Sequence, residues 1–274
     1  MDDILRDMLN ALFTFDTSSL DNLSLNLADY NGTAYELVTN LHDTAVVPVS
    51  SVVISIVLVL ELARNATHIE GDQQMGVKII AATMFKSALL IVAAQNSTMF
   101  LDAINEIATS IIKGLSDAGD LSAGELPPGV TDGISSAGKI DKAGMLMLII
   151  IPFLVALVAK IVIQVMVMMR FAELYMLSAF ASLPIAMLGH PDTKSMGIGY
   201  LQRYAATGLQ GVTLMMSVSI YSAISGVADI GGLESGQSLS SWIVKSYPQL
   251  LLAPVVLIFL VMASGRIAKA LVGQ

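Results

Sequence analysis

Two lysines and one glutamate interrupt apolar stretches long enough to cross a membrane. Glu61 lies near the end of one such stretch, Lys86 lies midway along the next, and Lys160 lies near the centre of a third. An ionisable group inside a bilayer is costly unless it faces water, a partner or the interior of a helix bundle. We therefore take Glu61, Lys86 and Lys160 as candidate pore or assembly residues.

Each lysine has a functional and a structural interpretation. Lys160 is either a cation at a pore or assembly interface, able to attract a phosphate backbone, or a structural lysine. In the second case its long stem brings the ammonium to a carbonyl group or to a buried acid such as Glu61. The same alternatives apply to Lys86. Two lysines with one acid leave at least one positive charge without a partner in the membrane, which favours a hydrated cavity or an oligomer interface.

No catalytic or metal-binding pattern accompanies these charges. His42, His68 and His190 lie on different segments without metal-ligand spacing, and cysteine is absent. The sequence has no glycine-rich phosphate loop of the G-x-x-x-x-G-K-[ST] type and no G-x-S-x-G turn. The sequence therefore predicts neither an enzyme nor a site for a cofactor, and it predicts no ATPase activity in this chain.

The composition sets the class of protein. Of 274 residues, 55% are hydrophobic and 13% are charged, and the mean hydropathy is +0.74. An ordinary soluble domain is about 45–50% apolar and about 25% charged. The expected fold is an all-α polytopic protein of the cell membrane.

A membrane-spanning helix needs about 20 mostly apolar residues. Five segments satisfy this, and a sixth apolar stretch, 171–188, follows Arg170 without a polar loop. It contains Pro184, which bends a helix, so it is a re-entrant or interfacial helix, or a kinked sixth span. The five predicted spans are 44–63, 77–95, 143–169, 205–227 and 249–264.

The distribution of charge predicts the orientation. Segments 1–43, 96–142 and 228–248 hold 17 acidic and five basic residues, whereas the remaining polar segments hold seven bases and four acids. Because cytoplasmic loops carry the excess of lysine and arginine, we expect five crossings, with the N-terminus outside and the C-terminus inside.

The spans divide the chain into four parts. We expect an external N-terminal segment with an amphipathic helix, a transmembrane hairpin, a second external segment with an amphipathic helix and a flexible loop, and a transmembrane core with a cytoplasmic loop at 189–204. Both amphipathic helices have acidic polar faces, so packing against other helices is favoured over binding to anionic lipid. The four parts are 1–43, 44–95, 96–142 and 143–274.

The region after the third span contains a group of polar and small residues. Arg170 and Glu173 are three residues apart, so they share one face of a helix and are expected to form an ion pair at the membrane interface. The sequence from Arg170 to Tyr221 resembles the core of the TrbL-like conjugal transfer proteins, the polytopic membrane subunit of type IV secretion systems, in the versions carried by Gram-positive conjugative elements. The residues that carry the resemblance are Arg170, Glu173, Pro184, Gly199, Tyr200, Gln210 and Gly211.

This resemblance implies a channel or scaffold subunit of a conjugation machine. It implies partners of four kinds, namely further copies of the chain, other secretion-system membrane subunits and ATPases, membrane lipids, and the transferred DNA–protein substrate. Two other classes stay open on the residues alone. A small-solute transporter predicts paired half-repeats with interrupted helices, and a holin-like pore predicts no dedicated partners.

Overall fold

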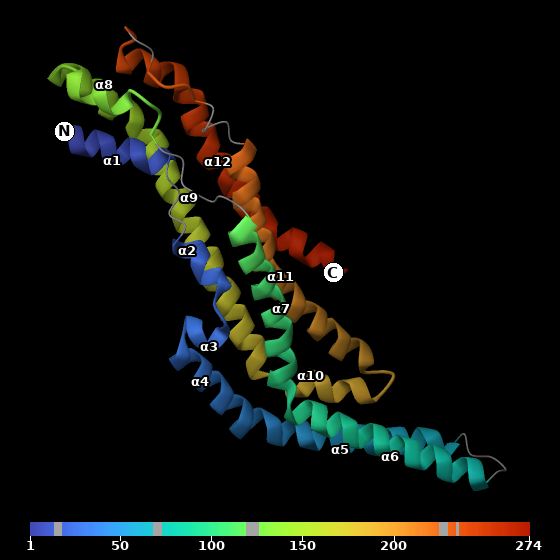
Figure 1. Cartoon of the computed structure of the whole chain (residues 1–274). Helices are drawn as coiled ribbons and strands as arrows, with labels where there is room; N and C mark the ends of the chain where they lie inside the picture. Colours follow the sequence, from blue (N-terminus) through green and yellow to red (C-terminus); the bar gives the residue numbers. More distant parts are fainter. Residues whose placement is uncertain (14–17, 68–72, 119–125, 225–229, 234–235) are drawn as a thin grey trace. The chain divides into compact units, whose positions relative to one another are not determined.

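Most of the residues that the computed structural model describes are helical. The described residues are 1–13, 18–67, 73–118, 126–224, 230–233 and 236–274. No strand occurs in these ranges, which confirms the all-α class (Figure 1). The first helices are α1 (Asp2–Phe13), α2 (Ser18–Asp21), η1 (Asn22–Ser24), α3 (Leu27–Tyr30), α4 (Gly32–Leu41), η2 (His42–Val46), α5 (Val47–Thr67), α6 (Gln73–Gln95) and α7 (Ser97–Ala118). They are followed by α8 (Val130–Ser136), α9 (Lys139–Ala179), α10 (Ser182–Ala186), η3 (Met187–Gly189), α11 (Lys194–Ile224) and α12 (Leu239–Leu271).

Four helical stretches in the described residues are long and apolar enough to cross a membrane. Each contains one of the predicted spans 44–63, 77–95, 143–169 and 249–264. The stretches are Gly32–Ala66, Gly76–Gln95, Lys139–Ala179 and Leu239–Leu271.

The remaining predicted span, 205–227, lies on α11 but is not among these four. Hydroxyl-bearing and amide side chains lower its hydropathy, and two of them, Thr213 and Ser217, are buried. The end of that predicted span, 225–227, lies outside the described residues. The number and orientation of the crossings therefore stay predictions.

The first long stretch is one helix with a wider turn inside it. Between α4 and α5, residues His42–Val46 form a π-helical turn, and Val47 N–H donates to the carbonyl of His42. Pro48 explains the position of this turn, because proline has no N–H to donate to the carbonyl of Thr44. The turn buries His42, whose Nε2 lies 3.0 Å from Ser97 Oγ at the start of α7.

Helix α9 continues past the predicted end of its span. It has 41 residues and extends through Ala179, so the first half of 171–188 belongs to α9 rather than to a separate re-entrant piece. The chain turns at Phe180–Ala181, and α10 follows. Pro184 lies in the first turn of α10, where backbone N–H groups have no helical partner in any case. The proline is therefore accommodated by a new helix start instead of a kink.

The chain forms two compact units, each described here by itself. The first comprises Met1–Ser24, Ser110–Met169 and Gln210–Ile267. Within it, Phe13 of α1 stacks on Trp242 of α12, with ring centroids 6.3 Å apart. Thr213 Oγ1 of α11 donates to the carbonyl of Ser264 on α12 at 3.0 Å. These contacts join α1 and α11 to α12.

An ion pair holds the start of α1 in the same unit. Lys142 Nζ lies 2.8 Å from Asp2 Oδ1, and the hydrogen bond and charge of this lysine lower the pKa of Asp2 from its ordinary value of 3.8. Because the folded-state pKa is below that of the unfolded chain, the contribution of the pair is present above the unfolded pKa. It is lost as the pH falls through the folded one.

We therefore expect α1 to loosen on acidification. Amide protection factors of α1, corrected for intrinsic exchange rates, should fall between neutral pH and a pH below 3.8. The variant Asp2→Asn should show weakened protection already at neutral pH. Asp3→Asn, which removes a neighbouring carboxylate outside the pair, should keep the acid-dependent loss. If Asp2→Asn and Asp3→Asn showed the same amide protection of α1 at neutral pH and on acidification, this role of Asp2 would be contradicted.

The second unit comprises Leu25–Thr109, Arg170–Leu209 and Ala268–Gln274. Its centre is the hairpin of α5 and α6, which lie side by side, with α10 packed against both (Figure 1). Ile185 and Ala186 of α10 form a small buried cluster with Ile54 of α5 and Ala94 of α6. The predicted spans 44–63 and 77–95 thus lie largely on two neighbouring helices, and the division of the chain into four parts stays a prediction.

Candidate functional site

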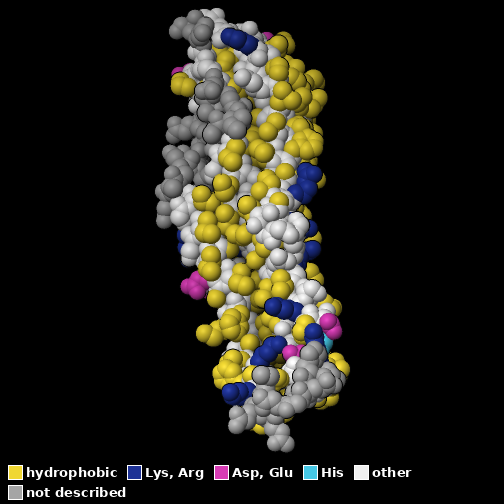
Figure 2. All heavy atoms as spheres, turned by 90° about the vertical axis from the view of Figure 1, so that its right-hand side faces the viewer, with side chains coloured by type: hydrophobic (Ala, Val, Ile, Leu, Met, Phe, Trp, Pro, Cys, Tyr) yellow, Lys and Arg dark blue, Asp and Glu magenta, His cyan; other side chains and the backbone are white. Residues whose placement is uncertain are grey.

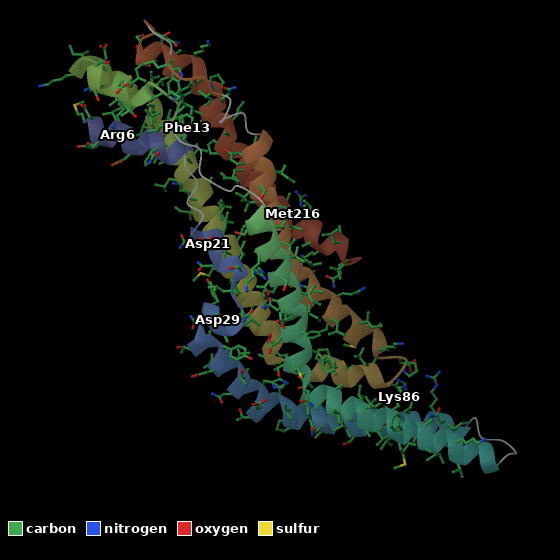
Figure 3. The ribbon with its side chains drawn as sticks, in the orientation of Figure 1. Arg6, Phe13, Asp21, Asp29, Lys86 and Met216 are labelled. Carbon is green, nitrogen blue, oxygen red and sulfur yellow. The ribbon has the colours of Figure 1, made fainter. Side chains whose placement is uncertain are left out.

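The hairpin brings two of the three predicted intramembrane charges together. Lys86 Nζ lies 3.5 Å from Glu61 Oε1, and Figure 3 shows Lys86 on α6. The Glu61 side chain is 14% exposed and that of Lys86 is 53% exposed. His190, which follows η3, places Nε2 4.0 Å from Glu61 Oε2. Since Glu61 Oε2 has no hydrogen-bond partner among the described residues, Lys86 is the principal partner of Glu61.

This pairing is what the structural interpretation of Lys86 expects, since Glu61 balances its charge within the hairpin. A pore or assembly role of Lys86 stays a prediction. Lys160 lies on α9 in the first unit and is half-buried. The ion pairs formed within the described parts of the two units use Lys86, Lys142 and Arg203, and none of them includes Lys160. Of the two predicted intramembrane lysines, Lys160 is therefore the one that forms no ion pair among the described residues.

Removing Glu61 alone should destabilise the hairpin. In Glu61→Leu, Lys86 keeps its charge without a partner, at a cost of about 2–3 kcal/mol in the free energy of unfolding. The double variant Glu61→Leu/Lys86→Leu removes both charges and should regain most of this loss. Denaturant unfolding in detergent measures both values. A double variant as unstable as Glu61→Leu would show that the charge pair is not the cause.

The end of α9 binds the N-terminal segment through aromatic residues. Arg170 and Phe171 are almost fully buried, and Arg170 Cζ lies 5.1 Å from the centroid of the Phe171 ring. Phe171 stacks on Tyr30 of α3, with centroids 3.7 Å apart and planes 5° from parallel. One turn further along α9, Tyr175 Oη donates to the carbonyl of Leu27 at 2.5 Å. Arg170 is therefore part of a packed aromatic contact rather than an exposed end of a span.

This contact conflicts with part of the predicted orientation. The charge distribution places Leu27 and Tyr30 outside, and it places Phe171 and Tyr175 at the cytoplasmic end of a crossing. In the structure these groups touch. Residues in contact lie at one depth of the bilayer, so the two assignments cannot both hold.

The predicted partner of Glu173 also differs. Glu173 forms its ion pair with Arg203 of α11, whose Nε donates to Glu173 Oε1 at 2.7 Å. On the same two helices, Tyr200 Oη donates to the carbonyl of Leu177 at 2.7 Å. Thus Glu173 and Tyr200, both among the residues that carry the family resemblance, join the end of α9 to the start of α11.

The other residues of the resemblance are divided between the units. The carbonyl of Gly199 accepts a hydrogen bond from Gln274 Nε2 at 3.1 Å, and Pro184 lies on α10, both in the second unit. Gln210 and Gly211 belong to the first unit, where the Gln210 amide lies against Gly265 of α12.

The histidines are dispersed, as the sequence indicates. His42 contacts Asp43 and Ser97, His190 lies beside Glu61 and Asp192, and His68 lies outside the described residues. The part of the chain that the structure describes contains no group of three or more histidine and acidic side chains that could hold a metal ion.

Tyr30 and Arg203 are partners that the sequence does not predict. Neither carries a local signal, because each meets its partner across a large separation in sequence. Tyr175 lies five residues after Arg170, but spacing alone does not indicate that its hydroxyl reaches the backbone of α3.

Comparison with known proteins identifies the family. The model of the family described as TrbL/VirB6 plasmid conjugal transfer like protein matches residues 19–182, more than half of the chain. The matched range includes Arg170 and Glu173 and ends before Pro184. No curated protein and no solved structure gives a significant match. The chain therefore belongs to the TrbL/VirB6 family of plasmid conjugal transfer proteins and is a helical membrane subunit of a conjugal transfer or type IV secretion system.

Proposed function

We propose that this chain is the channel scaffold of its secretion system in the cytoplasmic membrane. Several copies assemble around the route by which DNA or protein leaves the cell, and separate ATPases supply the energy. The observation that carries this proposal is Lys160, a half-buried cation in the longest apolar helix that takes part in no ion pair within the described part of its unit.

The surroundings of Lys160 support a position at an interface. Ala156, Ala159 and Ile163 form a buried stripe on α9, and Lys160 lies at the edge of this stripe. Leu157 and Ile161, on the other side of Lys160, are exposed. Intramembrane cations face water or a partner rather than lipid. A hydrated route beside this edge of α9 solvates the ammonium of Lys160, and a neighbouring copy of the chain there supplies it with a partner.

The exposed apolar surface is consistent with a lipid-embedded assembly. Hydrophobic side chains cover much of the face shown in Figure 2. Helix α7 contributes Phe100, Ile107 and Ile111 to the exposed set, while Leu101, Ala108 and Ile112 on another side of the same helix are buried. One apolar face of α7 thus packs inside the chain, and the other is available to lipid or to a partner.

Mating experiments test the role of the charge. In a donor strain lacking the native gene, we expect Lys160→Leu to lower transfer by about 100-fold, because the route or the neighbouring copy loses the cation that faces it. Lys160→Arg keeps the charge and should retain transfer. Lys139→Leu, which removes an exposed lysine at the start of the same helix, is the matched control. Wild-type transfer by Lys160→Leu at equal membrane levels would contradict the proposal.

Particle size tests the assembly separately. The detergent-solubilised protein should form rings of several copies, visible by electron microscopy and measurable by light scattering with correction for detergent. A monodisperse monomer under conditions that preserve the complex in membranes would count against a channel scaffold.

A further inference from the structure

A polar hollow lies in the second unit, between the segment containing α3 and α4 and the helix α7. Its volume is about 250 Å³. Five of its lining residues have polar side chains, and we call this set the acidic hollow. It consists of Asn26, Tyr35, Asp102, Asn105 and Glu106.

Two carboxylates occupy one wall of the acidic hollow. Asp102 and Glu106 are four residues apart on α7, so they lie on the same face of the helix. Like charges at this spacing repel one another unless a cation lies between them. The ion pairs that the described residues form include neither carboxylate. Asp102 Oδ2 accepts a hydrogen bond from Tyr35 Oη at 3.4 Å.

The acidic hollow is also lined by an amide side chain whose oxygen is buried. Asn105 lines the acidic hollow and is only 3% exposed. Its Oδ1 accepts no hydrogen bond from any residue that the structure describes. A buried acceptor without a partner costs about 1–3 kcal/mol, so Asn105 Oδ1 would gain from contact with an electropositive group.

The ligand chemistry is that of a hard cation. All the donors are oxygen atoms, from two carboxylates and an amide, and none is sulfur or imidazole nitrogen. Oxygen donors of this kind select Ca²⁺ or Mg²⁺. The hollow, at about 250 Å³, is larger than a bare ion. A cation that keeps part of its hydration shell fits this space.

We propose that the acidic hollow binds one partly hydrated divalent cation, Ca²⁺ or Mg²⁺, through Asp102, Asn105 Oδ1 and Glu106. All three ligands lie on α7, and Asn26 and Tyr35 line the same hollow. With only two carboxylates, the dissociation constant should be on the order of 0.1–1 mM, as in weak calcium sites. This proposal is independent of the channel role.

Calorimetric titration of the full-length protein in detergent tests the site. After treatment with a chelator, the protein is titrated with CaCl₂ and, separately, with MgCl₂, against KCl at equal ionic strength. Saturable binding near one ion per chain is expected for at least one divalent salt, with a higher unfolding temperature. KCl should produce neither effect. Absence of saturable binding for both divalent salts would overturn the proposal.

Matched variants locate the site. Asp102→Asn and Glu106→Gln should each weaken binding at least about tenfold, because each removes one of two anionic ligands. Glu36→Gln removes an exposed carboxylate on α4 that does not line the hollow, and it should bind as the wild type does. Circular dichroism checks that each variant is folded. Wild-type affinity in folded Asp102→Asn and Glu106→Gln, or equal loss in Glu36→Gln, would overturn the assignment.

Discussion

Replacing Gly197 by alanine should destabilise the second unit by about 3 kcal/mol, the upper part of the usual range for overpacking. A Cβ atom at this position would lie 2.5 Å from the carbonyl oxygen of Pro184 and 2.5 Å from Leu188 Cδ2. The leucine side chain can rotate away, but the carbonyl is part of α10. The clash therefore forces α10 away from the start of α11.

Gly199→Ala provides a control of opposite sign. Nothing lies within 4 Å of a Cβ atom built at Gly199, two residues further along α11. Because alanine is the better helix former by up to about 1 kcal/mol, this variant should be as stable as the wild type or more stable. Denaturant unfolding in detergent measures both. Equal shifts for the two variants would contradict the close packing of α10 on α11.

Phe171→Ala should have a comparable or larger effect, about 3–5 kcal/mol in the free energy of unfolding. The ring is fully buried and stacks on Tyr30, so its loss leaves a cavity between α9 and α3. Amide protection of α3 should fall more than that of the α5–α6 hairpin. The matched control is Phe180→Ala, since Phe180 is 51% exposed in the turn after α9.

A double-mutant cycle separates the stacking from general packing. Tyr30→Ala and the double variant Tyr30→Ala/Phe171→Ala complete the cycle with Phe171→Ala. The double variant should lose less than the two single losses together, by about 1 kcal/mol of aromatic coupling. Strict additivity, or a loss in Phe171→Ala no larger than in Phe180→Ala, would contradict the aromatic contact.

The sequence predicts the long helices well, because apolar runs are a strong signal. The predicted spans 44–63, 77–95, 143–169 and 249–264 each lie within an apolar helix. The amphipathic pattern near the N-terminus also holds, with Leu5, Leu9, Leu12 and Phe13 buried, although Ile4 is exposed.

The errors have a common physical origin. The charge of Arg170 indicates the end of a span, but α9 continues past this residue. Arg170 is buried there, beside the ring of Phe171. For Glu173, helical spacing indicates Arg170, but tertiary packing supplies Arg203. The close approach at Gly197 depends on α10, to which local sequence gives no clue. Local sequence patterns predict where the helices form. The contacts of the candidate site join residues far apart in the sequence, and local patterns do not reveal them.

The channel-scaffold proposal depends most directly on whether position 160 meets water. The chain contains no cysteine, so Lys160→Cys carries the only thiol and can be labelled in intact membranes with a cationic, membrane-impermeant methanethiosulfonate. We predict that Cys at this position reacts from the aqueous phase and that the added ammonium restores transfer. Ile161→Cys, on the exposed apolar side of α9, should stay unlabelled. If Lys160→Cys were labelled no more than Ile161→Cys in an assembled, transfer-competent system, the proposal would be contradicted.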